Sequence, residues 1–159
     1  MNYFELFDLP VSLWVDTSAL AKKYFELQKT FHPDFFTQAD ETAQQDALEK
    51  SSDINKALKV LKSQDATIKY VLQLKGLIEE EEKYPLPPNF LMEVMELNEN
   101  LSAGSTAVIA DFEKNIYADV SQIIEQYNDA AVSNEDLLKL KEYHYKKKYL
   151  QRILERLDG

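Results

Sequence analysis

The sequence predicts an all-α fold in two helical parts. Apolar residues recur at the three- and four-residue spacings of helices, and no strand-like alternation of any length interrupts them. Only three glycines and five prolines occur in 159 residues, of which 45% are hydrophobic, a composition that suits compact helical packing. We therefore expect an N-terminal helical hairpin followed by a C-terminal three-helix bundle.

The first half should form the hairpin. Its first long helix is expected to begin at Asp16 or Thr17 and to end at Phe31, because Pro33 moves His32 out of the α region. A loop over residues 32–40 should lead to a second helix over 41–62, antiparallel to the first. Short segments over 3–7 and 68–74 complete this half, the latter stopped at Gly76. The predicted buried stripes contain Leu20, Tyr24, Leu27 and Phe31 in the first helix and Ala47, Ser51, Ile54, Leu58 and Leu61 in the second.

A break follows at residues 76–89. Four consecutive glutamates occupy 79–82, and three prolines fall within the four positions 85–88; neither pattern favours a continuous helix. We predict a first domain over 1–76, a linker over 77–87 and a C-terminal bundle over 88–159. Its three helices are expected at about 88–101, 105–128 and 134–157, the middle one striped by Ile109, Phe112, Ile116, Val120, Ile123 and Tyr127 and the last opened by a capping box at Ser133.

Composition excludes several classes of function. The chain has no cysteine, so it can form neither disulfides nor CxxC sites, nor ligate an iron–sulfur cluster through its own thiolates. A net charge of −10 argues against nucleic acid. Residues 76–159 carry −8 of that charge, which favours a basic partner surface. No apolar run is long enough to span a bilayer and the N-terminus has no signal-peptide pattern, so we expect no membrane association and a cytoplasmic location.

The tripeptide His32-Pro33-Asp34 stands at the predicted tip of the hairpin. Lys22, Lys23 and Lys29 are expected on the solvent side of the preceding helix. An exposed histidine and aspartate braced by a proline form a preorganised polar probe for a partner's crevice. The alternative is a plain helix-terminating turn in which Asp34 caps local amides. No nucleophile, phosphate loop or metal-ligand cluster accompanies the motif, so we expect no enzyme, metal or cofactor.

The segment 90–101 has more apolar residues than one buried face can use. Phe90, Val94, Leu97 and Leu101 share one side of a helix and should pack in the bundle. The opposite side should present a partner-binding surface, because methionine adapts to partners and glutamates select a basic counterpart. The alternative is a central helix buried on both sides. The residues of the predicted surface are Leu91, Met92 and Met95 with Glu96 and Glu99.

Several segments resemble a known family over nearly the whole chain. Residues 3–10, 32–34, 54–58 and 70–76 are similar to the J-domain of the HscB co-chaperones, which bring an IscU-type iron–sulfur scaffold protein to a DnaK-class ATPase. The resemblance implies no catalysis by the chain itself, but stimulation of the partner's ATPase. It implies chaperone contacts through His32, Pro33, Asp34, Lys22, Lys23 and Lys29, and scaffold contacts through Leu91, Met92, Met95, Glu96, Glu99 and Tyr149.

The sequence departs from the family pattern in a few places. Phe35 and Phe36 follow the tripeptide where the family has a basic residue, Glu26 interrupts the lysine face, and Ala103 replaces a family acidic position. Tyr143 or Tyr145 could take the place of Tyr149. The run Lys146-Lys147-Lys148 is interpreted as a solvated charge run or one near the C-terminus of a helix. Three alternatives stay open: a dedicated HscA-like ATPase or the general DnaK as partner, a general J-protein delivering unfolded clients, and a non-chaperone helical adaptor.

Overall fold

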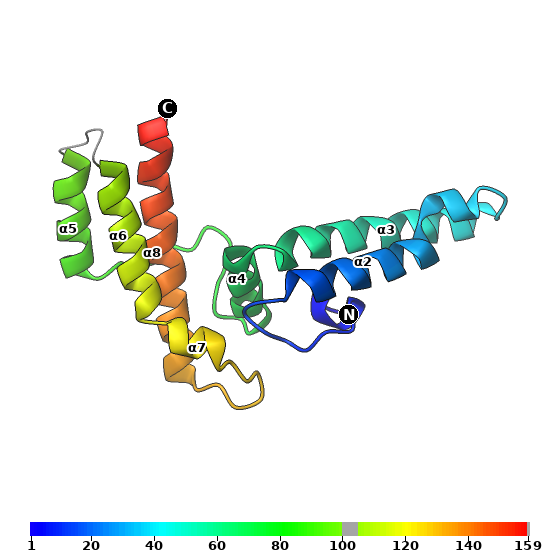
Figure 1. The fold of residues 1–159 in the computed structure, drawn as a ribbon, viewed down its shortest axis with the longest axis horizontal. Helices are drawn as coiled ribbons and strands as arrows, with labels where there is room; N and C mark the ends of the chain where they lie inside the picture. The colour runs from blue at the N-terminus through cyan, green and yellow to red at the C-terminus, as the bar shows by residue number, and fades with distance from the viewer. Residues whose placement is uncertain (100–104, 159) are drawn as a thin grey trace. The chain divides into compact units, whose positions relative to one another are not determined.

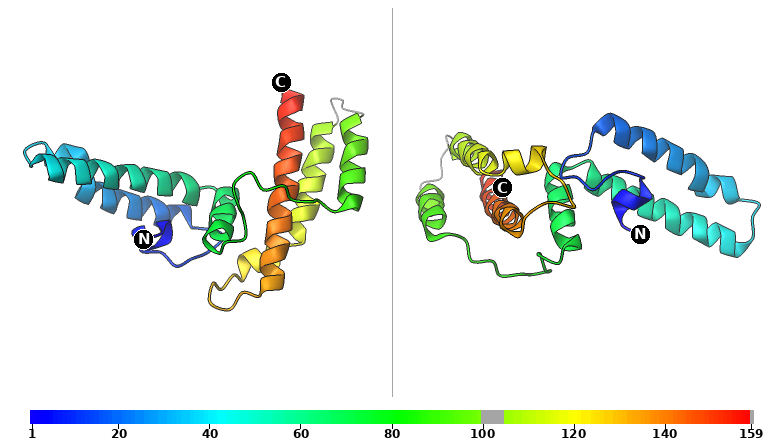
Figure 2. Two further views of the ribbon diagram at one scale, coloured as in Figure 1. Left: turned by 180° about the vertical axis from the view of Figure 1, so that it is seen from behind. Right: turned by 90° about the horizontal axis from the view of Figure 1, so that it is seen from below.

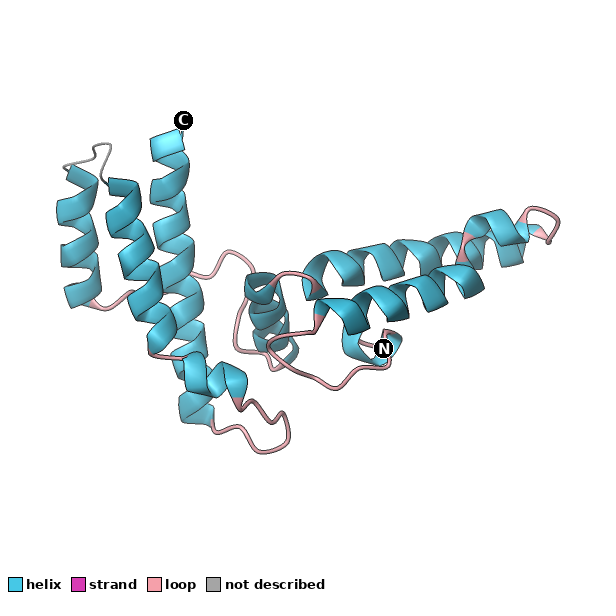
Figure 3. Cartoon of the chain, viewed as in Figure 1, coloured by secondary structure: helices cyan, strands magenta, loops and turns pink. Residues whose placement is uncertain are grey.

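The structure, a computed structural model, describes residues 1–99 and 105–158. Every regular element in this part of the chain is helical (Figure 3), as the sequence predicted. No helix within these residues is both long and apolar enough to cross a membrane. The chain divides into two compact units, Met1–Val71 and Leu72–Gly159. The predicted boundaries at 76/77 and 87/88 stay predictions.

The first unit is built around two antiparallel helices. Helix α2 (Thr17–Phe31) and helix α3 (Glu41–Leu61) lie side by side in every view (Figures 1 and 2). The short α1 (Tyr3–Leu6) precedes them, and α4 (Gln64–Leu74) crosses into the second unit. The buried side chains shared among these helices include Phe4, Phe7, Leu13, Leu20, Ile54, Leu61 and Ile68, none more than 2% exposed.

The ends of α2 follow the predicted local chemistry. The Ala19 amide donates a hydrogen bond of 3.3 Å to the Asp16 carboxylate, which caps the helix. The helix ends at Phe31, and His32 is extended with φ −64° and ψ 134°. The loop predicted over 32–40 is not wholly irregular, however, because Pro33–Phe36 forms a 3₁₀ turn. Proline at the first position of a turn already has the required φ and lacks an amide that would need a partner.

Helix α4 ends at the predicted glycine. Gly76 adopts φ +73°, a left-handed conformation that glycine reaches without Cβ strain. The Gly76 amide donates to the Gln73 carbonyl at 3.0 Å, and the Leu77 amide donates to the Leu72 carbonyl at 2.9 Å. These two bonds form a Schellman motif, which satisfies carbonyls at the helix end.

The second unit contains a bundle of α5 (Pro88–Glu99), α6 (Ser105–Ala118) and α8 (Asn134–Asp158) (Figure 1). The Asp136 amide donates to Ser133 Oγ at 3.1 Å, which is the Ser133 half of the capping box predicted for the last helix. The buried residues of this bundle include Val94, Ile109, Ile116, Leu140, Leu150 and Ile153.

The single middle helix predicted over 105–128 is wrong. The chain leaves α6 at Ala118, turns, and forms the short α7 (Ser121–Glu125). The Val120 amide donates to the Tyr117 carbonyl at 3.0 Å in a tightened last turn. The turn shifts the helical phase, so that Ile124 is buried at 5% exposure where the uninterrupted stripe predicted Ile123.

Candidate functional site

The tip of the α2–α3 hairpin is fixed by a local hydrogen bond from its own motif. His32 Nδ1 accepts the Asp34 amide hydrogen at 3.2 Å and so caps the 3₁₀ turn. In the neutral ring the hydrogen must then be on Nε2. The cap is thus made by the histidine, and the alternative in which Asp34 caps local amides is not what the structure shows.

Both polar side chains of the tip reach solvent. The His32 and Asp34 side chains are 44% and 86% exposed, and Asp34 Oδ2 lies 3.6 Å from His32 Nδ1. The Phe35 ring meets the imidazole edge-on, with centroids 6.3 Å apart, and is itself exposed. The tip therefore presents an N–H donor, a carboxylate and an aromatic ring within one 3₁₀ turn.

Catalysis or metal binding at the tip would need further groups beside His32 and Asp34. A base such as His32 requires a nucleophile or a bound electrophile within hydrogen-bond reach. Within residues 1–99 and 105–158, no group of three or more His, Asp or Glu residues is placed to hold a metal ion. What the tip offers is a preformed surface for contact with another molecule.

The three predicted lysines of α2 do not share one face. Lys22 and Lys29 are exposed and lie on the same side of the helix. Lys23 lies about 100° away around the axis, and its ammonium is 3.6 Å from the Asp8 carboxylate. Phe25, which was not singled out from the sequence, is 64% exposed and lies close to Lys29 on the helix surface. Its signal was an aromatic residue outside the apolar stripe.

Helix α5 has two faces of different character. Phe90 and Val94 are buried, at 7% and 0% exposure, while Met92 and Met95 are 68% and 51% exposed. The alternative of a helix buried on both sides therefore does not hold for this unit. We call the exposed side the α5 surface; it consists of Leu91, Met92, Met95, Glu96 and Glu99, of which Leu91 is half-buried and the others exposed. Leu101 and Ala103 lie outside the described residues.

The three candidate tyrosines of α8 have different surroundings. Tyr143 and Tyr145 are buried, whereas Tyr149 is half-buried. The Tyr149 ring meets the Phe90 ring at 6.4 Å, which brings it next to α5. Of the three, Tyr149 combines partial exposure with contact to the helix that carries the α5 surface.

The lysine run of α8 is not uniformly solvated as predicted. The Lys146 side chain is only 16% exposed, with its ammonium 3.7 Å from the Glu142 carboxylate and 5.3 Å from the centroid of the Phe90 ring. Lys147 lies over the Tyr143 ring. Only Lys148 is exposed. The aliphatic stems of lysine cover apolar surface while their charged ends reach water or an acid.

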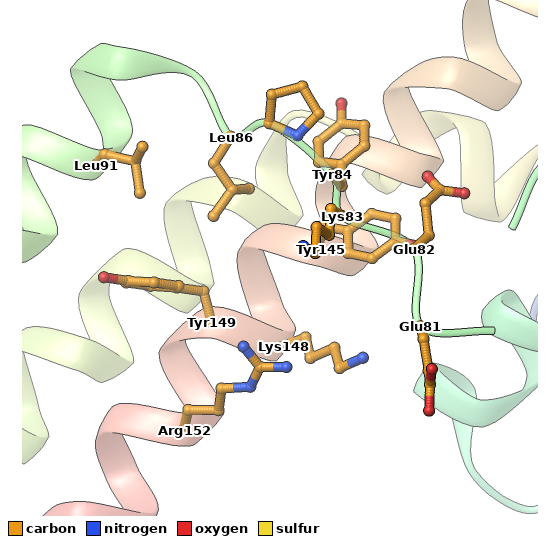
Figure 4. A pocket seen from close by; sticks show the side chains of 11 residues that line it. Glu81, Glu82, Lys83, Tyr84, Leu86, Leu91, Tyr145, Lys148, Tyr149 and Arg152 are labelled. Carbon is orange, nitrogen blue, oxygen red and sulfur yellow. The ribbon is translucent and has the colours of Figure 1, made fainter. Parts of the chain in front are cut away.

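A pocket of about 600 Å³ opens beside Tyr149. Figure 4 shows Leu86 and Leu91 at the end of the pocket that Tyr149 faces, with Lys148 and Arg152 projecting from α8 nearby. Sequence reasoning missed this feature. Its only signal was the spacing of Tyr145, Lys148, Tyr149 and Arg152, which places them on one helix face.

An ion pair at the rim fixes the charge of one pocket residue. Glu82 and Lys141 are 2.9 Å apart, with side chains 19% and 18% exposed. The hydrogen bond from Lys141 holds the pKa of the Glu82 carboxyl below its ordinary value. Burial, reinforced by the nearby Glu82 charge, raises the pKa of the Tyr145 hydroxyl. Glu82 therefore stays ionised but is neutralised by its partner.

Comparisons with known proteins agree over both units. The family described as the HSCB C-terminal oligomerisation domain matches residues 86–158. The co-chaperone protein HscB homolog of Vibrio parahaemolyticus is 38% identical over 139 residues, covering 87% of this chain and 80% of that protein. The homolog of Shewanella amazonensis is 36% identical over 156 residues, covering 89% and 90%.

Two solved structures have similar folds. The crystal structure of human co-chaperone protein HscB superposes with a TM-score of 0.81 at 30% identity, over 99% of this chain and 81% of that one. The chaperone HscB from Vibrio cholerae gives a TM-score of 0.59 at 32% identity, over 99% of both chains. These likenesses extend across the hairpin tip and the α5 surface alike.

Proposed function

Because the chain belongs to the HscB family of co-chaperones, we propose that it binds an IscU-type iron–sulfur scaffold protein and stimulates the ATPase of a DnaK-class chaperone. In this proposal it acts in the cytoplasm, assists iron–sulfur cluster biogenesis and performs no catalysis of its own. The observation that carries the proposal is the geometry of His32 and Asp34.

The tip is suited to a chaperone partner because a hydrogen bond orients the His32 ring before binding. The Asp34 amide is already bonded to His32 Nδ1, so the Nε2 hydrogen and the Asp34 carboxylate remain for intermolecular bonds. Preorganised groups lose little conformational entropy on association. Lys22 and Lys29 supply a positive face beside the tip, which would steer the unit toward an acidic patch and raise the association rate.

The α5 surface supports the scaffold part of the proposal. Met92 and Met95 expose apolar area on a helix whose opposite side is held in the bundle by Phe90 and Val94. A rigid helix face with adaptable methionines and a glutamate edge suits a structured protein partner with a basic patch. Glu96 and Glu99 belong to this edge. Tyr149 extends the same apolar area from α8.

The test uses the 159-residue chain with two purified partners. The scaffold protein is titrated into the chain by calorimetry, and steady-state ATP hydrolysis by an HscA-like chaperone and by DnaK is measured with and without the chain. We expect saturable scaffold binding and stimulation of at least one ATPase. Which one responds identifies a dedicated or a general partner.

A competition experiment separates the general J-protein alternative. If an extended unfolded peptide displaces the scaffold from the chain, the chain hands unfolded clients to DnaK. If the chain binds the scaffold but stimulates neither ATPase, the chain is an adaptor without chaperone function. Specific scaffold binding combined with ATPase stimulation supports the proposal.

A further inference from the structure

The pocket beside Tyr149 joins an apolar end to a cationic side. Leu86, Leu91 and Tyr149 line the apolar end, and Lys148 and Arg152 line the cationic side (Figure 4). Leu91 also belongs to the α5 surface, so the pocket continues that surface from α5 across to α8. A partner bound to the α5 surface can therefore also contact the pocket, because Leu91 belongs to both.

The charged residues that line the pocket are Glu81, Glu82, Lys83, Lys148 and Arg152, so its cations outnumber its carboxylates. Glu82 is already paired with Lys141 at 2.9 Å, so it cannot fully neutralise a second cation. Lys148 and Arg152 are exposed, and no carboxylate among residues 1–99 and 105–158 forms an ion pair with either. An arginine and a lysine one helical turn apart form a site for a carboxylate, which the planar guanidinium binds through two hydrogen bonds.

We propose that this pocket binds an acidic segment of the scaffold protein. An aliphatic side chain of the segment lies between Leu91 and Tyr149, and an aspartate or glutamate carboxylate pairs with Arg152 and Lys148. The inference rests on the proposed function, since it names a second contact for the same client. Two features of the pocket select this occupant. The apolar end favours a ligand with an aliphatic group over a simple anion. The two cations favour a ligand with a carboxylate over a purely apolar one.

The pocket also explains how the client would be oriented. Glu96 and Glu99 give the α5 surface a negative edge, while Arg152 and Lys148 give the pocket a positive one. A client with a basic patch and an acidic residue at matching separation binds in one orientation, because the reversed orientation places like charges together. The sequence predicted a basic partner from the glutamates of this surface. It did not predict the cationic side formed by Arg152 and Lys148.

Charge reversal in the 159-residue chain tests the proposal. Arg152→Glu and Lys148→Glu are compared with the wild type by calorimetric titration of the IscU-type scaffold, with a thermal melt of each variant. Lys114→Glu is the matched control, because Lys114 is an exposed lysine of α6 in the same unit but outside the pocket. We expect each pocket variant to weaken binding about tenfold or more, the size of a lost charge-assisted hydrogen bond, with the control unchanged.

The outcomes separate the pocket from the proposed function. If both pocket variants bind as tightly as the wild type while alanine substitution of Met92 and Met95 abolishes binding, the pocket proposal is overturned and the scaffold assignment stands. If the wild type does not bind the scaffold at all, both are overturned. Rescue of Arg152→Glu by one scaffold Asp→Lys or Glu→Lys substitution supports the carboxylate pairing, and failure of every surface acid to rescue it overturns the pairing.

Discussion

The rings of Tyr84 and Tyr145 are stacked, with centroids 4.6 Å apart and an angle of 7° between their planes. Tyr84 belongs to the proline-rich segment before α5, and Tyr145 to α8. The Lys141 ammonium lies 5.6 Å from the centroid of the Tyr84 ring while it pairs with Glu82. The segment that the sequence marked as a break is thus held against α8 by aromatic and ionic contacts.

Removing the stack should destabilise the second unit. We expect Tyr84→Ala to lower the free energy of unfolding by about 1 to 3 kcal/mol, from lost apolar burial and ring stacking. A double-mutant cycle with Tyr145→Ala, followed by urea denaturation, should give a coupling of about 1 kcal/mol. Tyr84→Phe is the control and should keep the coupling. Additive effects of the two alanine substitutions would mean that the rings do not stabilise each other.

Substitutions in the hairpin tip should separate function from stability. His32→Gln and Asp34→Asn are expected to abolish stimulation of the chaperone ATPase. The free energy of unfolding should change by no more than about 1 kcal/mol, because both side chains are exposed and one cap hydrogen bond is lost at most. Asp53→Asn on α3 removes an equivalent exposed charge and should leave both properties intact. If the tip variants stimulate the ATPase normally, the tip does not contact the chaperone as proposed.

The two faces of α5 should respond oppositely to truncation. Joint replacement of Leu91, Met92 and Met95 by alanine should weaken scaffold binding by several kcal/mol. Stability should change little, because alanine favours helix and two of the side chains are exposed. Val94→Ala should instead cost about 2 kcal/mol of stability through a cavity and leave binding largely intact. Calorimetric titration beside thermal melts checks both, and the reverse pattern would make the α5 surface part of the core.

Acid should weaken the Glu82–Lys141 pair in a defined range. The native pKa of Glu82 lies below its ordinary value of 4.5, chiefly through the Lys141 hydrogen bond. Its stabilising contribution is therefore complete above about pH 4.5 and is lost as the pH falls through the lowered native pKa. Glu82→Gln should destabilise the chain at pH 7, and its difference from the wild type should shrink as the pH is lowered toward 3. A difference that does not vary with pH would contradict this role.

Local chemistry in the sequence predicted the helix ends well. The residues at these ends act through neighbours only a few positions away, so their effects can be predicted without knowledge of the fold. They are Asp16, Pro33, Gly76 and Ser133. The middle helix was mispredicted because its apolar spacing continues across Val120, and only the packing of α6 and α7 shows the shift in phase.

The candidate surfaces were predictable in part. The two faces of α5 follow from helical spacing alone, since Val94 and Met95 differ by about 100° around the axis. The low exposure of the Lys146 side chain could not be predicted, because the Phe90 ring beside its ammonium belongs to another helix. The pocket at Arg152 was missed for the same reason: Leu86 and Leu91 reach it from segments about 60 positions away in the chain.

The contact between Tyr3 and Tyr70 bears on the order in which the first unit assembles. The two rings stack at 4.6 Å, and the Tyr3 amide donates to the Tyr70 hydroxyl at 2.9 Å across 67 positions of sequence. Closing so long a stretch of chain costs more entropy than pairing α2 with α3 across a short turn. During synthesis the hairpin can therefore form first, and the N-terminus must wait for residue 70 before it docks. We expect the contacts of Tyr3 to form late in folding. Tyr3→Ala should therefore accelerate unfolding and leave the folding rate nearly unchanged.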